Sequence, residues 1–222
     1  MEHNRQSGDA ESDKRCERVT WEQFQRLAWV LAAQIRDAGF RPDLIVAIAR
    51  GGYLPARQLS DCLDIFDLAS VRVEHYHGVH KTRQARVRYP LTAKIDGRRI
   101  LLVDDVSDSG DTFEVTLAHL HSLGRPAEIR CAVLHHKQTS GFVPDYFAEE
   151  QRAWRWIVYP WAITEDLASL LREILPAPVE ACERRLRERH GLLLPRETLE
   201  AALRCIDPGQ VDAGEGKDPG GR

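Results

Sequence analysis

The sequence predicts an α/β fold in which helices flank a mainly parallel sheet, followed by a helical C-terminal appendage. Two continuous apolar runs of strand length, 44–49 and 100–103, are typical of strands buried on both faces of a parallel sheet, and residues 129–134 are expected to form a third strand. Segments with helical periodicity alternate with them, at 20–38, 54–63 and 115–123. After Thr164 the pattern is purely helical, interrupted by prolines.

Composition excludes several classes of protein. The chain has 222 residues, of which 43% are hydrophobic and 29% are charged, so it is not a low-complexity or mostly disordered protein. The net charge is only −3, which argues against a protein that works mainly by holding nucleic acid. The five cysteines are odd in number and form no C-x-x-C pair, so we expect reduced thiols rather than disulfides or a zinc site.

The polar residues 1–18 do not form a signal peptide, and no apolar run reaches the ~18 residues that cross a bilayer. We therefore expect a soluble, cytoplasmic protein with no membrane contact. Residues 1–18 and 207–222 are expected to be disordered tails, residues 19–166 the main domain, and residues 167–206 the helical appendage.

The elements are expected in the following order. Thr20 and Gln23 have the capping-box spacing of a helix start, and Gly39 is a plausible stop. The tryptophans of this helix, Trp21 and Trp29, are expected to pack against the protein. Residues 71–76 alternate like a strand, the basic stretch 77–89 reads as a long mobile loop, and 156–159 is a short strand.

The most informative segment runs from Leu101 to Thr112. It consists of an apolar strand, the two carboxylates Asp104 and Asp105, and a small-residue loop, S-D-S-G-D-T, that opens a helix. Ligands of open α/β sheets bind at the carboxyl ends of strands, and such a loop directs backbone N–H groups at a phosphate. The pattern is neither a P-loop nor a G-x-G-x-x-G motif. It suits a sugar phosphate, while an ordinary capped turn or a phospho-acceptor site is the alternative.

This segment resembles the ribose-phosphate signature of type I phosphoribosyltransferases, Rossmann-like enzymes that use 5-phosphoribosyl diphosphate (PRPP). The resemblance extends over about residues 21–166. It implies that Asp104 and Asp105 hold the ribose 2- and 3-hydroxyls, directly or through Mg²⁺ as metal ligands, and that Asp108 is the catalytic acid/base. The 5-phosphate would be bound by the loop 108–112, which consists of Asp108, Ser109, Gly110, Asp111 and Thr112.

Two further segments extend the resemblance on the PRPP side. Arg50 and Gly51 stand in the place of the family's diphosphate loop, after the first strand. The basic stretch His80–Arg86 stands where the family has a flexible loop that closes over the site. Taken alone, the first would be a plain turn and the second a solvated run of charges.

Two segments resemble the purine branch of the family. Lys137 matches the lysine that donates to the 6-oxo group in hypoxanthine-guanine and xanthine-guanine enzymes. Trp156 and Ile157 match their base-stacking segment, with the Trp156 ring on the purine face and the Ile157 backbone at the base edge. Otherwise Lys137 would be a surface cation and Trp156 a core residue. Several relatives carry a metal-binding acid where this chain has Ala162, so a second metal site is left open.

The resemblance implies transfer of the phosphoribosyl group from PRPP to a 6-oxopurine in purine salvage, with Mg²⁺ and without nucleic acid. The choice among hypoxanthine, guanine and xanthine is open. A PRPP-binding regulator without turnover, or the same reaction on adenine or another base, is the alternative. Family members usually associate, so a homo-oligomer is expected. The function of the appendage is left open.

Overall fold

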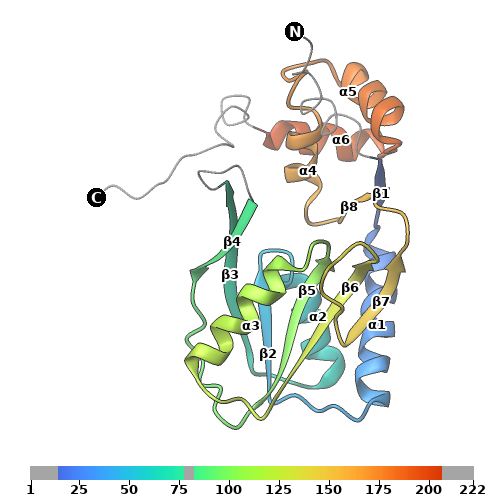
Figure 1. Ribbon diagram of the computed structural model, residues 1–222. Helices are drawn as coiled ribbons and strands as arrows, with labels where there is room; N and C mark the ends of the chain where they lie inside the picture. The colour runs from blue at the N-terminus through green and yellow to red at the C-terminus, as the bar shows by residue number, and fades with distance from the viewer. Residues whose placement is uncertain (1–14, 78–82, 207–222) are drawn as a thin grey trace. The chain divides into compact units, whose positions relative to one another are not determined.

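The computed structural model describes residues 15–77 and 83–206, and these form two compact units. We call residues 22–154 the sheet unit; the helical unit consists of residues 15–21 together with 155–206. Both units are drawn in Figure 1, where the colour runs from blue at the N-terminus to red at the C-terminus. The family motifs of the PRPP side and Lys137 fall in the sheet unit, whereas Trp156 and Ile157 fall in the helical unit.

The sheet unit contains a six-stranded sheet in the order β4-β3-β2-β5-β6-β7. All neighbouring strands are parallel except β3 and β4, which confirms the mainly parallel sheet. The strands are β2 (Leu44–Ala49), β3 (Leu68–His77), β4 (Arg83–Tyr89), β5 (Arg99–Ser107), β6 (Glu128–Lys137) and β7 (Tyr146–Gln151).

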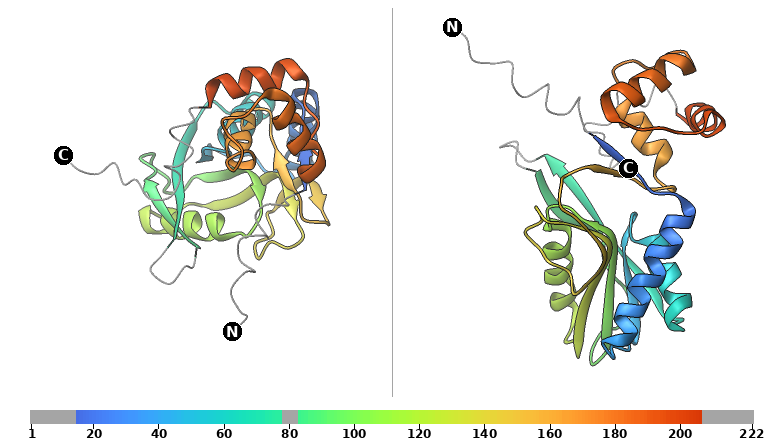
Figure 2. Two further views of the ribbon diagram at one scale, coloured as in Figure 1. Left: turned by 90° about the horizontal axis from the view of Figure 1, so that it is seen from above. Right: turned by 90° about the vertical axis from the view of Figure 1, so that its right-hand side faces the viewer.

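Helices cover both faces of this sheet. Figure 2 shows α1 (Trp21–Asp37) and α2 (Tyr53–Leu63) on one face and α3 (Asp111–Leu123) on the other. Helix α1 starts directly after Thr20, as the capping-box spacing predicts, and Gly39 follows its end with a φ of +70°. A positive φ favours glycine because it has no Cβ, which explains why the helix stops there.

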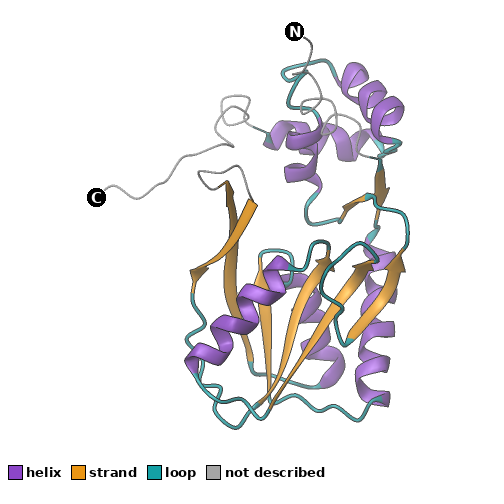
Figure 3. Ribbon diagram, in the orientation of Figure 1, coloured by secondary structure: helices purple, strands orange, loops and turns teal. Residues whose placement is uncertain are grey.

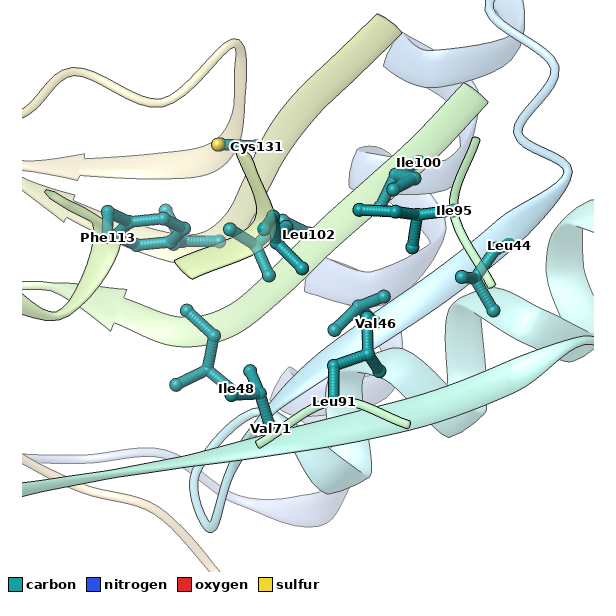
Figure 4. Packing of buried hydrophobic residues seen from close by; sticks show 12 residues of the cluster. Leu44, Val46, Ile48, Val71, Leu91, Ile95, Ile100, Leu102, Phe113 and Cys131 are labelled. Carbon is teal, nitrogen blue, oxygen red and sulfur yellow. The ribbon is translucent and has the colours of Figure 1, made fainter. Parts of the chain in front are cut away.

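One core cluster of the sheet unit lies on the face covered by α3, where alternate residues of the central strands pack with Phe113 and Leu120 of α3; Figure 4 shows members of this cluster. Strand β2 is buried along its whole length, since both its edges are paired and both its faces are covered. The buried members of this cluster are Leu44, Val46, Ile48, Val71, Leu91, Ile95, Ile100, Leu102, Phe113, Leu120, Cys131 and Val133.

The stretch expected to be a long loop is instead mostly strand. Residues 83–89 form β4 and pair antiparallel with β3, so the prediction of a mobile loop over 77–89 was wrong outside residues 78–82, which lie outside the described residues. An edge strand needs a partner on one side only, and charged side chains are common there. A polar, basic sequence is therefore compatible with a strand at this position.

Two smaller expectations were also wrong. Cys16–Arg18, placed in a disordered tail, form strand β1, in which Cys16 is buried. Trp29 does not pack in the core but is 56% exposed, whereas Trp21, although 53% exposed, packs against Trp161 with ring centroids 6.1 Å apart, as expected. Helix α1 buries a face formed by other residues, namely Phe24, Ala28, Leu31, Ala32 and Ile35.

The helical unit has its own core and its own small sheet. Strand β1 pairs in parallel with β8 (Trp156–Val158), and the helices are α4 (Ile163–Leu170), α5 (Val179–Arg185), η1 (Leu186–His190) and α6 (Arg196–Cys205) (Figure 3). Leu167, Leu186 and Leu199 are among the buried residues that join the helices. The helical appendage of the prediction is confirmed. Among the described residues no helix has the length and apolar character needed to cross a membrane.

Candidate active site

The carboxyl ends of β2 and β5 bring the Arg50-Gly51-Gly52 loop against the acidic pair. These strands are parallel neighbours, so the residues that follow β2 meet the end of β5. A Cβ built on Gly51 would lie 2.4 Å from Asp105 Oδ2, and one built on Gly52 would lie 2.3 Å from the Val103 carbonyl oxygen. Both glycines are therefore required by close approach. The Ala49–Arg50 peptide bond in this loop is cis.

The acidic pair differs in environment from one residue to the next. Asp104 is buried, and its Oδ1 accepts a hydrogen bond from the Asp105 backbone N–H at 2.9 Å. Burial, and then the negative charge of Asp105, raise the pKa of the Asp104 carboxyl well above its usual range. Asp105 is half-buried and borders Gly51. Two adjacent carboxylates of this kind offer the hard oxygen ligands that Mg²⁺ prefers.

Replacing Gly51 with alanine tests this close approach. The new methyl group would occupy the place of the Asp105 carboxylate, so the Asp105 side chain must turn away while the backbone stays in place. If the acidic pair binds PRPP, as the resemblance implies, Gly51→Ala should raise the PRPP KM by roughly 10-fold or more, about 1.4 kcal/mol, with a much smaller change in Tm. Gly39→Ala, just after α1 and outside the site, is the control: a methyl group there would meet nothing within 4 Å, and the φ of +70° strains alanine, so it should lower Tm and leave the PRPP KM unchanged. An unchanged PRPP KM would remove Gly51 from the site.

The loop 108–112 connects β5 to the start of α3. Gly110 is the residue that precedes the helix, with a φ of +100°, and its carbonyl oxygen accepts the backbone N–H groups of Phe113 and Glu114. At the first turn of the helix the Thr112 hydroxyl lies 3.1 Å from His75 Nε2 of β3. A helix N-terminus with neighbouring hydroxyl groups is suited to bind an anion.

The segment Ser140–Phe142, which follows β6, holds this loop in place. The Gly141 N–H donates to the Ser109 carbonyl oxygen at 2.9 Å, and the Ser107 hydroxyl donates to the Phe142 carbonyl oxygen at 3.0 Å. The Phe142 ring stacks on Phe113 of α3, with centroids 4.8 Å apart. Ser140 and Phe142 were not among the predicted site residues, and the S-G-F segment after Lys137 is the signal that could have indicated them.

Asp108 and Lys137, both predicted from the sequence, are in direct contact. Lys137 Nζ donates to Asp108 Oδ2 at 2.9 Å from the end of β6. Trp154, which the sequence analysis did not single out, donates from its indole Nε1 to Asp108 Oδ1 at 3.0 Å. The Lys137 ammonium also lies 4.4 Å from the centroid of the Trp154 ring, within the range of a cation–π interaction.

Trp156 and Ile157 lie on β8 in the helical unit. The Trp156 indole Nε1 donates to Asp166 Oδ1 at 2.9 Å, and Ile157 is buried. Asp166 is itself buried on α4, which begins directly after Ala162. The predicted contacts of Trp156 and Ile157 with a base stay predictions.

Residues 20–165 match the sequence model of the phosphoribosyl transferase domain family. The matched region includes both the acidic pair and the Lys137 segment. The chain belongs to the phosphoribosyl transferase family. The family match ends inside α4, so most of the helical unit lies beyond the matched region.

Two of the proteins similar to this phosphoribosyl transferase domain are named as purine or xanthine-guanine phosphoribosyltransferases. A xanthine-guanine phosphoribosyltransferase from Gluconobacter oxydans (strain 621H) is 35% identical over 146 residues, which are 64% of this chain and 82% of the relative. A solved purine phosphoribosyltransferase from Pyrococcus horikoshii is 35% identical and has a TM-score of 0.59, covering 66% of this chain and 93% of its own. A hypothetical protein from Neisseria gonorrhoeae with bound ppGpp is 29% identical, with a TM-score of 0.58 over 67% of this chain and 89% of its own.

Proposed function

We propose that this phosphoribosyl transferase domain moves the 5-phosphoribosyl group from PRPP to a 6-oxopurine. The products are a purine nucleoside monophosphate and diphosphate, as in purine salvage. The observation that carries the proposal is the Lys137–Asp108 ion pair of 2.9 Å, because it puts a candidate donor for a 6-oxo group beside a candidate base. The xanthine-guanine names of the relatives support the same substrate class.

Four parts of the chain are proposed to bind PRPP. The loop 108–112 holds the 5-phosphate with backbone N–H groups and the Ser109 and Thr112 hydroxyls. Asp104 and Asp105 hold the ribose hydroxyls. Arg50 supplies a fixed positive charge for the diphosphate, and Gly51 lets the backbone approach it closely.

The acidic pair also fits a divalent cation. Its donors are carboxylate oxygens, and the Asp105 carboxylate occupies the place that a Cβ on residue 51 would take. Asp104 and Asp105 would hold Mg²⁺, which supplies positive charge against the charge that develops on the leaving diphosphate. Position 162 offers no acid for a second metal ion, because it is Ala162. The nearby Asp166 carboxylate already accepts a hydrogen bond from the Trp156 indole N–H.

The base side acts on the purine during the reaction. A ring nitrogen of the purine forms the new bond to the anomeric carbon as the bond from that carbon to the diphosphate oxygen breaks. Asp108 takes or shares the proton of the imidazole ring of the base, while Lys137 donates to the 6-oxo oxygen. Stacking of Trp156 on the purine face and contact of the Ile157 backbone with the base edge stay predictions of the resemblance.

Homo-oligomerisation, a cytoplasmic location and the absence of a nucleic-acid partner stay predictions. The net charge of −3 supports the last of them, since it leaves no basic excess for phosphate backbones.

A binding protein without turnover is the second candidate function. The observation that favours it is the relative with bound ppGpp, a guanine nucleotide with phosphates at both ends of its ribose. Such a ligand would use the same base and phosphate contacts without any reaction. Diphosphate release therefore separates the two candidates, whereas binding of PRPP or of a nucleotide does not.

The experiment that tests the proposed function is a panel of bases with PRPP and Mg²⁺. Hypoxanthine, guanine, xanthine and adenine are supplied singly, and diphosphate release is measured. We expect release with at least one 6-oxopurine, loss of release in excess chelator, and recovery with added Mg²⁺. PRPP binding without release from any base would favour the regulator, and preference for adenine would contradict the 6-oxopurine assignment.

A further inference from the structure

Trp154 contacts both groups that the proposed function assigns to the purine. Its indole N–H donates to Asp108 Oδ1 at 3.0 Å, and its ring lies over the Lys137 ammonium at 4.4 Å. Asp108 Oδ2 is at the same time bonded to Lys137, so the three side chains form a closed cluster.

The chemistry of the indole matches the chemistry of the proposed ligand. Both indole and purine are flat bicyclic rings with an N–H in the five-membered ring. In this structure that N–H donates to the carboxylate that is proposed to receive the imidazole N–H of the base. The Trp154 ring and a purine therefore compete for the same acceptor.

Burial shows which group the ring covers. Lys137 is the last residue of β6, at the carboxyl edge of the sheet, yet its side chain is only 3% exposed. The Asp108 side chain beside it is 43% exposed. A 6-oxo oxygen must come within hydrogen-bond distance of the Lys137 ammonium, on which the Trp154 ring now rests. The ring must therefore leave Lys137 before the base is bound as proposed.

The main chain allows this movement. Strand β7 pairs with β6 up to Gln151, opposite Lys137, and Trp154 is carried on the short connection beyond it. Trp154 is 42% exposed, so one side of the ring already faces solvent. Rotation of the side chain breaks one hydrogen bond and one cation–π contact and requires no strand to separate.

We propose that Trp154 is an internal occupant of the base site, which a purine displaces from Asp108 and Lys137 when it binds. This inference rests on the proposed function. Only the fraction of molecules with Trp154 displaced accepts a base, so the apparent affinity for the base is reduced by that fraction. Removing the ring should therefore tighten base binding, the opposite of what loss of a purine contact would do.

The test compares two substitutions with a control. Trp154→Ala removes both contacts, Trp154→Phe keeps an aromatic face for Lys137 but loses the N–H donor, and Trp29→Ala removes an exposed tryptophan of α1. We expect the KM for hypoxanthine at saturating PRPP to fall by about tenfold in Trp154→Ala and about threefold in Trp154→Phe, with the control unchanged. An equal or higher KM in Trp154→Ala would overturn the proposal.

A second measurement needs no turnover. Brief acetylation of the ligand-free protein with acetic anhydride, followed by peptide mass spectrometry, reports the accessibility of each lysine. Lys137 should react several times faster in Trp154→Ala than in the wild type, while Lys94 reacts equally in both. Equal Lys137 rates would overturn the covering role of Trp154. If no variant and no wild-type protein releases diphosphate but Lys137 is uncovered as expected, the proposed function fails and the covering contact stands.

Discussion

Asp108→Asn is expected to lower kcat by about 10²- to 10⁴-fold, the range for loss of a positioned acid/base group. Asparagine keeps the size and the position of the side chain but cannot take a proton from the purine. It also offers one acceptor oxygen in place of two, while Lys137 and Trp154 both donate to this carboxylate. We expect the PRPP KM to change much less than kcat, because the phosphate contacts proposed for the loop 108–112 are mainly backbone N–H groups.

The control for this substitution is Glu114→Gln, which removes an exposed carboxylate in the first turn of α3. Steady-state kinetics with a fixed base and varied PRPP separate kcat from KM. An Asp108→Asn enzyme with wild-type kcat would remove Asp108 from catalysis, and the base role would then have to be assigned elsewhere.

Lys137→Met is expected to lower kcat/KM for hypoxanthine and guanine by about 10- to 150-fold, the value of a charge-assisted hydrogen bond of ~1.5–3 kcal/mol. Methionine keeps the length and the apolar stem of the side chain in this buried place. The Lys137–Asp108 contact adds a second effect, because loss of the ammonium also removes a partner of Asp108. Every base should therefore lose some activity, and 6-oxopurines should lose more.

The selectivity ratio separates these two effects. We would measure kcat/KM for hypoxanthine and for adenine or unsubstituted purine, and compare their ratio between Lys137→Met and the wild type. Lys94→Met, outside the site, is the control. A uniform loss with an unchanged ratio would mean that Lys137 acts only by holding Asp108, and the 6-oxopurine assignment would lose its main support.

The buried parts of the fold could be predicted because an apolar run of strand length or a helical periodicity is a local pattern of the sequence. The strand 44–49 was placed at the correct bounds, and the helix before it begins and ends near the expected cap and glycine. Strands β1, β4 and β7 were missed, since they are short or lie at an edge and carry charged residues. An edge position is a property of the assembled sheet, which no local pattern encodes.

The candidate site was predictable where a motif is contiguous and unpredictable where it is assembled by tertiary contact. Asp104, Asp105 and the loop 108–112 follow one strand, so one segment of sequence contains them. Trp154 reaches Asp108 across 46 residues of chain, and Phe142 packs on Phe113 across α3 and β6. Neither contact leaves a periodic signal, because each depends on where a connection crosses the end of the sheet.

The pairing of β2 with β5 has a consequence for biosynthesis. Asp43, just before β2, bonds to Arg99, at the start of β5, and these residues are 56 positions apart in the chain. At synthesis rates of ~5–20 residues per second, the ribosome needs about 3–11 s to supply the second partner strand. During that time the six apolar residues of β2 have at most one paired edge, and an apolar strand of this kind tends to aggregate. Substitutions within 44–49 are therefore expected to act first on the yield of folded protein during translation.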